Sequence, residues 1–418
     1  MAKKMLFLVV LLFSLTGMLK AQVTTAGMSG KVMADEESVI GATVVAVHEP
    51  SGTSYGTVTN VDGRFSLQGM RSGGPYKVTV SYIGYQTAIY TGIQLQLGET
   101  YSLNVTLHEA SELLGEITIT ASKSKFSAEK TGATTNISSE QLTTLPSINR
   151  SISDFTRISP YASGNSFGGR DGRSNTFTVD GANMNNNFGL SSDLPGGGNP
   201  ISLDAIDEVQ VVIAPYDVRQ ANFIGAGINA ITKSGTNAYR GSAYMYFNNE
   251  VMRGNKIGDT DFGVRAEESK TVYGATLGGP IIKDKLFFFA NVEYEKSPQQ
   301  VITWRAAREG EDPNNSTISR TTEADLAEFS QILKDKYGYN TGSFTDFPAD
   351  VTNLKLLGRI DWNINQGNKL SVRLTLPIIK PGTHPMAVRE IPGIVWHTTV
   401  FRPTPCLMQT LAILCRTL

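Results

Sequence analysis

The chain has 418 residues with a formal net charge of −1, and only two of its residues are cysteine. A near-neutral chain has no electrostatic reason to bind polyanions, which excludes nucleic acid as a partner. Two cysteines cannot staple a disulfide-rich extracellular fold. None precedes Cys406, so we expect no lipid-anchored start.

Residues 1–21 have the layout of a secretory signal peptide. Lys3 and Lys4 precede an apolar run from residue 5 to residue 15, and small or polar residues follow up to Ala21. The run is too short to span a bilayer as a helix, so we expect cleavage after Ala21. No later stretch of 18 apolar residues occurs, which leaves soluble exported domains or a β-barrel.

Residues 24–108 have the pattern of a compact all-β module. Apolar and polar residues alternate from Tyr76 to Tyr82 and from Tyr101 to Leu107, which is typical of half-buried strands. Asp62-Gly63 lies between two such runs and favours a tight hairpin. The spacing of these runs predicts a small β-sandwich.

Three stretches of this module, "GKVMADEESVIGATVVAV", "TNVDGRFSL" and "VSYIGYQT", resemble the carboxypeptidase regulatory-like domain. That resemblance implies a transthyretin-like sandwich without catalytic activity, of a kind that often precedes outer-membrane receptors. Asp62 is then a turn former and not a metal ligand.

Residues 113–125, "LLGEITITASKSK", contain a short β-prone run between polar flanks. An extended segment of this kind can add a strand to a partner's sheet through backbone hydrogen bonds. It can equally be the last strand of the sandwich or a linker.

Residues 126–237 contain a helix-like "SSEQLTTLPS", which Ser138 or Ser139 can cap, and then the glycine-rich "GGRDGRSNTFTVDG". The glycines of that stretch could direct backbone amides at an anion, and Asp171 and Asp180 could hold a cation. It lacks both the Lys-Ser/Thr ending of a P-loop and the strand–glycine–helix order of a dinucleotide site. A phosphate-binding loop is therefore not expected here.

The block from "GGRDGRSNTFTVDG" through "LDAIDEVQVV" to "GAGINAITKSG" resembles the plug of TonB-dependent receptors, in the same order and at similar spacing. The resemblance implies an α+β plug with a strand through Phe177 and a turn at Asp180. The core motif that it implies comprises Gly169, Arg170, Asp171, Gly172, Asp180, Gly181, Gly225, Gly227 and Asn229. The polar loop at residues 182–200 would face ligand in such a plug or be a disordered surface loop. Its candidate ligand-facing residues are Asn183, Asn185, Asn186, Asn187 and Phe188.

Residues 240–376 alternate over runs of about ten residues, with an apolar face and a charged face, for example from Leu286 to Glu295 and from Leu354 to Asn365. A wall with lipid outside and water inside needs this pattern, whereas the strands of a soluble sandwich are usually shorter. "QGN" at residues 366–368 predicts a tight hairpin. We expect five or six strands of a β-barrel.

The alternation stops after Leu376, and residues 377–418 contain six prolines and both cysteines. Since proline cannot serve a central strand, we expect this tail to lie outside the wall. Five or six strands cannot close a barrel of 22, the number in the family that the sequence resembles. A truncated or frame-shifted product is therefore expected, with a bona fide short variant or an assembly of fragments as the alternatives.

The resemblance covers residues 24–376 and is to TonB-dependent outer-membrane receptors of the Oar-like type. It implies a mainly β protein that imports a ligand across the outer membrane and has a periplasmic N-terminal domain. The implied partners are TonB with the inner-membrane energy-coupling complex, outer-membrane lipid, an unidentified ligand and a partner lipoprotein. The TonB box, the segment that pairs with TonB, would be Glu116, Ile117, Thr118, Ile119 and Thr120.

Enzymatic activity is not expected, because no metal-ligand spacing and no catalytic triad is recognisable around His48, His108, His384 or His397. No cofactor is implied. The alternative to transport is a secreted or surface-exposed β-rich binding or adhesion protein. The ligand is not evident from the sequence, since siderophores, oligosaccharides, peptides and cobalamin are all imported by this architecture.

Overall fold

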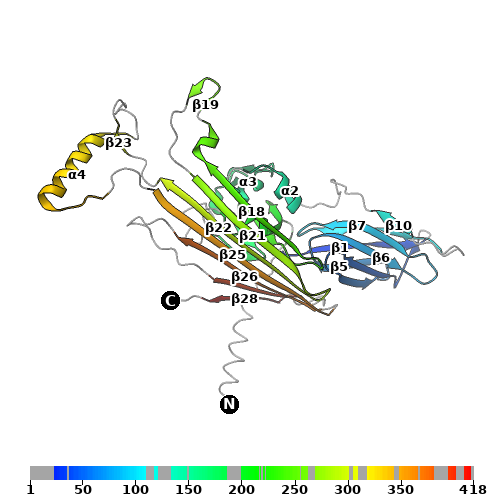
Figure 1. Ribbon diagram of the computed structural model, residues 1–418. Coiled ribbons are helices and arrows are strands. Elements are labelled where there is room, and N and C mark those ends of the chain that lie inside the picture. Colours follow the sequence, from blue (N-terminus) through cyan, green and yellow to red (C-terminus); the bar gives the residue numbers. More distant parts are fainter. Residues whose placement is uncertain are drawn as a thin grey trace, which may run out of the picture.

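Three units follow one another along the chain in the computed structural model (Figure 1). They are a sandwich (residues 23–109 with 117–120), a mixed domain (133–232) that we call the inner domain, and a large sheet from residue 240 onward that we call the wall. The expected signal peptide lies outside the described residues. These are 23–34, 37–109, 117–120, 133–147, 150–185, 199–215, 217, 220–221, 223–254, 256–261, 269–300, 305–308, 318–342, 348–365, 368–380, 394–401 and 409–415.

The sandwich packs two five-stranded sheets face to face. The first sheet contains β1 (Ala26–Ala34), β2 (Glu37–Ser38), β5 (Arg64–Met70), β8 (Thr100–Ser102) and β9 (Val105–Leu107). The second has the order β10-β7-β6-β3-β4, with β3 (Thr43–His48), β4 (Thr53–Val58), β6 (Gly73–Ser81), β7 (Ala88–Leu95) and β10 (Ile117–Thr120). The predicted alternation is confirmed, because Tyr76, Val78 and Val80 are fully buried in the core between the sheets.

The turn predicted at Asp62-Gly63 is present, but the prediction that it closes a hairpin is wrong. Gly63 has a φ of +71° and its N–H donates to the carbonyl of Asn60 (2.9 Å). The Asn60 side chain also accepts from the N–H groups of Asp62 and Arg64. The strands on either side, β4 and β5, belong to different sheets, so this turn carries the chain from one layer of the sandwich to the other.

The inner domain surrounds a five-stranded sheet of order β11-β16-β17-β14-β15. Its strands are β11 (Thr134–Ser138), β14 (Thr176–Val179), β15 (Ala182–Asn183), β16 (Ile206–Val212) and β17 (Gly227–Thr232). Its other elements are α2 (Ser139–Thr144), α3 (Ile152–Thr156), β12 (Ala162–Ser163), β13 (Ser166–Phe167), η1 (Gly172–Ser174) and η2 (Leu203–Ala205). The predicted helix and strands are therefore present, and Phe177 is buried in the core.

The wall is a sheet of seven strands, each antiparallel to its neighbour. They are β18 (Arg240–Asn249), β21 (Ser269–Ile282), β22 (Leu286–Gln300), β25 (Pro348–Asn365), β26 (Asn368–Lys380), β27 (Ile394–Phe401) and β28 (Gln409–Cys415). The predicted alternation is confirmed, and its polarity is inverted relative to a soluble sheet. Glu293 and Lys355 are only 3–5% exposed, whereas Val292, Ile360 and Trp362 are 43–46% exposed.

The charged face of the wall lies against the inner domain, while the sandwich lies at one end of the long strands (Figure 1). The small elements at the other end are η3 (Glu250–Arg253), β19 (Lys256–Ile257), β20 (Thr260–Asp261), β23 (Arg305–Ala307), β24 (Ile318–Thr322) and α4 (Glu323–Tyr337). Among the described residues, no helix has the length and hydropathy needed to cross a membrane.

The prediction that residues 377–418 lie outside the wall is wrong for the described part of that tail, residues 377–380, 394–401 and 409–415. Strand β26 continues to Lys380 with Pro377 opposite Lys355, and β27 and β28 extend the same sheet. The remaining prolines fall between the strand ranges, so those two strands keep their backbone donors. These prolines, Pro381, Pro385, Pro392, Pro403 and Pro405, lie outside the described residues.

Gly30 in β1 provides a test of the sandwich packing. A Cβ at this position would lie 1.8 Å from the Leu103 carbonyl oxygen, which is backbone and cannot move aside. We expect Gly30→Ala to destabilise the sandwich by about 1–3 kcal/mol, measured by hydrogen exchange of β1 and β5. Gly56→Ala in β4, where a Cβ meets nothing within 4 Å, is the control and should leave exchange unchanged. Equal effects of the two substitutions would contradict the observed packing.

Candidate functional site

The turn at Asp180-Gly181 joins β14 to β15 and also fastens the end of β17. Both residues have positive φ values, +48° and +87°, as a two-residue type I′ hairpin requires, and Asp tolerates this conformation better than most residues. The Asp180 carboxylate accepts from the Thr232 N–H (3.0 Å) and hydroxyl (2.6 Å). One buried side chain thus sets the turn and ties together the ends of two neighbouring strands.

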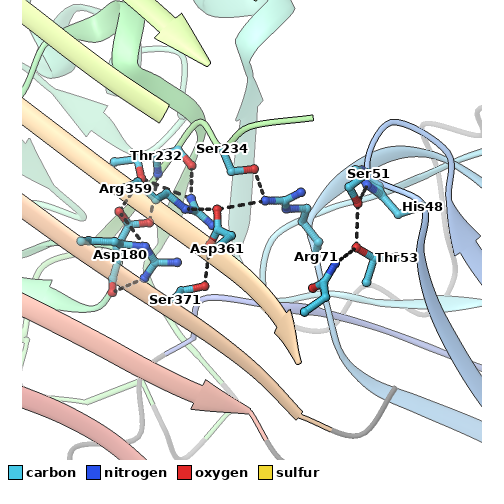
Figure 2. A network of polar contacts seen from close by, with 12 residues as sticks. His48, Ser51, Thr53, Arg71, Asp180, Thr232, Ser234, Arg359, Asp361 and Ser371 are labelled. Carbon is cyan, nitrogen blue, oxygen red and sulfur yellow. Dashed lines mark hydrogen bonds and ion pairs between the residues drawn. The ribbon is translucent and has the colours of Figure 1, made fainter. Parts of the chain in front are cut away.

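Asp180 also links the inner domain to the wall (Figure 2). Its carboxylate lies 3.5 Å from the Arg373 guanidinium of β26, and Arg359 of β25 donates to the Thr232 carbonyl (2.5 Å). Arg359 in turn pairs with Asp361 (2.8 Å), which accepts from the Ser371 hydroxyl (2.5 Å). The four charged side chains in this network, Asp180, Arg359, Asp361 and Arg373, are each at most 10% exposed, so each charge depends on its partner.

A second polar contact lies farther along the same face of the wall. Glu293 of β22 pairs with Lys355 (2.8 Å) and accepts from the hydroxyls of Tyr244 and Ser202 (2.8 Å each). Ser202 belongs to the inner domain, so here too a wall carboxylate is satisfied by the domain packed against it. Among the described residues of the wall, by contrast, only Phe289 and Leu357 enter the core of the inner domain. The interface between the two units is therefore mainly polar.

The residues expected as one plug motif occupy two different places. Asp180, Gly181, Gly225, Gly227 and Asn229 lie in or beside the inner sheet, where a Cβ on Gly225 would lie 2.3 Å from the Asn175 amide oxygen. Thr178 donates to Asn229 across β14 and β17 (2.7 Å). The other members, Gly169, Arg170, Asp171 and Gly172, form an exposed turn.

That exposed turn is organised by Asp171. Its carboxylate accepts from the Arg173 backbone N–H and guanidinium (2.9 Å each) and caps η1. These hydrogen bonds from Arg173 lower the pKa of Asp171. The charge of Asp171 is thus paired locally with Arg173. No group of three or more His, Cys, Asp or Glu side chains within the described ranges could hold a metal ion.

The loop residues expected to face ligand are only partly described. The Asn185 amide accepts from the Phe177 N–H (2.6 Å) and donates to the Asn175 carbonyl (3.1 Å), so it holds the loop against β14. Asn183 is exposed and accepts from the Asn185 N–H (2.8 Å). The remaining candidates, Asn186, Asn187 and Phe188, lie outside the described residues.

The strand-addition candidate forms β10, except for Glu116, which lies outside the described residues. Residues 117–120 pair in parallel with Ala88–Thr91 of β7 and form the terminal strand of that sheet. The backbone edge of β10 that faces away from β7 therefore has no neighbouring strand among the described elements. This position is compatible with strand addition and with the alternative that β10 is simply the last strand of the sandwich.

One end of the sandwich contacts the wall. Arg71 reaches from the turn between β5 and β6 to the Ser234 hydroxyl and to Asp361 (3.3 Å), as Figure 2 shows.

In the turn between β3 and β4, hydrogen bonds run from His48 through Ser51 to Thr53 (2.7 and 2.8 Å). Thr53 then accepts from the Asn363 amide of β25 (2.9 Å). Burial, with smaller contributions from Arg71 and Lys369, lowers the pKa of His48 to about 3, so this imidazole is neutral at physiological pH.

The same end of the sandwich contacts the inner domain through Leu97. Its N–H donates to both carboxyl oxygens of Glu208 (3.1 Å each), and its carbonyl accepts from the Gln210 amide (2.5 Å). Burial raises the pKa of Glu208 to about 8. The carboxyl group is therefore mostly protonated at neutral pH.

The connector between the inner domain and the wall, residues 233–239, is held at several points. The Lys233 N–H donates to the Ala205 carbonyl, and the Asn237 N–H donates to the Pro50 carbonyl (2.8 Å each). A Cβ on Gly235 would lie 2.5 Å from the Phe288 carbonyl oxygen, so only glycine lets the connector pass this close to the wall.

Arg71, Glu208, Thr232 and Arg373 were not singled out as site residues by the sequence. The alternation of apolar and charged residues assigned Arg359 and Asp361 to the charged face of the wall. It did not predict which groups of the inner domain and the sandwich pair with them. The partners lie far away in sequence: Arg71 and Asp361 are 290 positions apart.

Asp180 should matter more than Asp171, although both belong to the same glycine-rich stretch. Asp180→Ala leaves the Thr232 donors without their acceptor and the buried Arg373 without its counter-ion, and we expect it to destabilise the inner domain by about 2–4 kcal/mol. Asp171→Ala removes only exposed contacts and should have little effect. Hydrogen exchange of β17 would compare the two, and similar protection in both variants would contradict the role assigned to Asp180.

Glu208 predicts a pH dependence of stability. The pKa of Glu208 in the folded protein, about 8, lies above the ordinary value of 4.5 for a glutamate side chain. The contribution of this group is thus complete below pH 4.5 and is lost as pH rises through 8. Between pH 6 and pH 9, the melting temperature of the native protein should fall more than that of Glu208→Gln, which cannot ionise. Exposed Glu37→Gln is the control, and parallel pH curves for the native protein and Glu208→Gln would refute the raised pKa.

Comparison with known families identifies two regions. Residues 27–108 match the carboxypeptidase regulatory-like domain, and residues 231–377 match an outer membrane beta barrel domain. The sandwich and the wall are therefore the two regions recognised, and the second match places the chain in the outer membrane.

The chain is also similar to individual proteins. It is 25% identical over 336 residues to the TonB-dependent transporter Oar of Myxococcus xanthus, an alignment covering 76% of this chain and 30% of that protein. The siderophore receptor PirA of Acinetobacter baumannii is similar in structure, with a TM-score of 0.43 and 18% identity over 65% of this chain and 38% of PirA. The transporter YddB of Escherichia coli has a TM-score of 0.40 and 14% identity over 64% and 36% of the two chains.

The chain thus spans only about a third of the length of these relatives. The order of units agrees with the order of the matches, since the sandwich comes first and the wall last. The chain therefore carries a carboxypeptidase regulatory-like domain followed by strands of an outer membrane β-barrel domain, and it is a homologue of the TonB-dependent transporter Oar.

Proposed function

We propose that this protein is a TonB-dependent transporter, in which the inner domain is a plug that blocks the pathway along the charged face of the wall. The observation that carries the proposal is the mainly polar interface between inner domain and wall, formed by Asp180, Arg359, Arg373, Ser202 and Glu293. The match to an outer membrane beta barrel domain and the similarity to Oar support this assignment.

A polar interface suits a plug that must be stable at rest and movable when pulled. Breaking an apolar contact exposes apolar surface to water, and the whole free energy gained by burying that surface is lost. A hydrogen bond broken in a wet lumen is replaced by one to water, so its net cost is only about 0.5–1.5 kcal/mol. Since Phe289 and Leu357 are the only wall residues within the described ranges that enter the core of the inner domain, most of the observed contacts between the two units are of this exchangeable kind.

Strand β10 is the coupling segment in this mechanism. Glu116 to Thr120 would pair with TonB by strand addition, and energy from the inner-membrane complex would then act on the plug through the chain that leads to β11. The position of β10 at a sheet edge supports this role. The ligand would contact the loop of Asn183, Asn185, Asn186, Asn187 and Phe188, and its chemical class stays open. A partner lipoprotein belongs to the same proposal.

Binding of the purified periplasmic domain of TonB to the full-length protein tests the coupling segment. Ile119→Pro removes a backbone donor from β10 and should weaken binding about tenfold or more. Ile119→Ala keeps that donor and should bind within about threefold of the native protein. If both variants bind TonB as the native protein does, residues 116–120 are not the coupling segment.

Extraction of membranes separates transport from the alternative of surface adhesion. A protein whose wall strands face lipid should stay in the outer-membrane fraction after alkaline carbonate treatment and dissolve only in detergent. Release by carbonate alone would favour a peripheral adhesion protein. Retention without TonB binding would place the protein in the outer membrane but argue against energy-coupled transport.

A further inference from the structure

We propose that the sandwich is a brace that holds the inner domain in its resting position on the wall, and that it must detach before the inner domain can move. The first part rests only on contacts within this chain. The second part rests on the proposed transport function.

The brace contacts the wall and the connector through the β5–β6 turn and through the β3–β4 turn with the adjoining start of β4. Arg71 pairs with Asp361 and donates to Ser234, and Thr53 accepts from Asn363. Beside them the Lys369 ammonium lies 3.2 Å from the centre of the Tyr55 ring. The Pro50 carbonyl accepts from Asn237 of the connector. The sandwich thus presents one cation, Arg71, and two hydrogen-bond acceptors. Each of these groups meets a complementary group on the wall or the connector.

The brace contacts the inner domain through a separate turn, the one between β7 and β8. Leu97 is bonded through both its N–H and its carbonyl to the neighbouring side chains of Glu208 and Gln210 on β16. Glu99 accepts from Asn136 of β11 (3.2 Å). Gly98, with a φ of +70°, has no room for a Cβ, which would lie 2.8 Å from the Gln210 amide. This contact is therefore closely fitted.

These two sets of contacts lie at one end of a single packed sandwich, so the sandwich connects β16 of the inner domain rigidly to β25 of the wall. Arg71 is central to this connection. Its partner Asp361 is also the partner of Arg359, and Arg359 holds the Thr232 carbonyl of the inner domain (Figure 2). The Arg71 side chain, at 21% exposed, and the Glu208 residue, at 7%, are largely removed from water, so each loses solvent on docking and needs its partner.

Docking by polar groups also makes the brace releasable. The contacts named above are hydrogen bonds, ion pairs and one cation–π contact, each of which can be exchanged for water. A pull on β10, the edge strand of the sandwich, would act on this docked end through β7, which leads directly into the Leu97 turn.

Hydrogen exchange of the full-length protein in outer-membrane vesicles tests the brace without any transport assay. Arg71→Ala and Glu208→Ala should each speed exchange of β16 and β17 about tenfold or more, because the inner domain loses an external support. Arg64→Ala is the matched control. Arg64 is an exposed arginine at the other end of β5, about 20 Å away along the strand. Exchange of the core strands β3 and β6 should stay slow in all three variants, which shows that the sandwich is folded.

A reversible crosslink provides the converse measurement. A Cβ on Gly52 would lie 2.9 Å from the Asp284 Cγ, so Gly52→Cys with Asp284→Cys brings two thiols within disulfide reach in a background with Cys406→Ser and Cys415→Ser. Disulfide formation, checked by mass spectrometry, should restore slow exchange of β16 in Arg71→Ala, and a reductant should abolish the effect.

The outcomes separate the brace from the transport function. Unchanged exchange of β16 and β17 in both Arg71→Ala and Glu208→Ala, or no protection by the crosslink, would overturn the brace. Faster exchange together with failure to bind TonB would keep the brace and overturn the transport function. In the crosslinked protein, movement of the inner domain on TonB addition without reductant would overturn the requirement for detachment.

Discussion

The inverted polarity of the wall is the constraint on which the rest of the structure depends. Its outer face is apolar, so Glu293, Lys355, Arg359 and Asp361 must all point inward. Buried charges of this density are tolerated only when each has a partner. The inner domain supplies part of that pairing through Asp180, and the sandwich supplies another part through Arg71. The three units are thus assembled by charge pairing around one sheet, while the sandwich and the inner domain each have an apolar core of their own.

The separation between cores and interfaces has a functional meaning. The sandwich and the inner domain each enclose a distinct cluster of buried apolar side chains, which fixes their internal structure. The contacts between units are mainly polar. Units of this kind can move relative to one another without unfolding, because the cost of opening falls on exchangeable contacts and not on the cores.

Local patterns predicted much of this fold. Alternation identified the strands of the sandwich and the wall, and the Asp-Gly pair identified the turn at residues 62–63, since these signals need only neighbouring residues. The turn at residues 180–181 was predicted from the resemblance to receptor plugs. Two errors had a common cause. The turn at 62–63 joins different sheets, and the proline-rich tail adds two strands, because the strand that pairs with a given segment is decided by distant parts of the chain.

The candidate site was predictable only in part for the same reason. Asp180 was identified as a turn residue, and its second role, as the acceptor for Thr232 and the counter-ion of Arg373, needed the assembled structure. Arg71 gives no local signal at all, because an arginine at the end of a strand is ordinary on any surface.

The pinned connector at residues 233–239 limits what the inner domain can do. Gly235 is packed against the wall, and Asn237 is hydrogen-bonded to Pro50. The inner domain and the wall, which lie at the two ends of this connector, therefore cannot separate freely. Even fully extended, these seven residues span only about 25 Å. In the proposed transport function, the inner domain would therefore be a tethered body that swings about a pivot near Gly235. Such a swing would open the proposed pathway on the side opposite the pivot first.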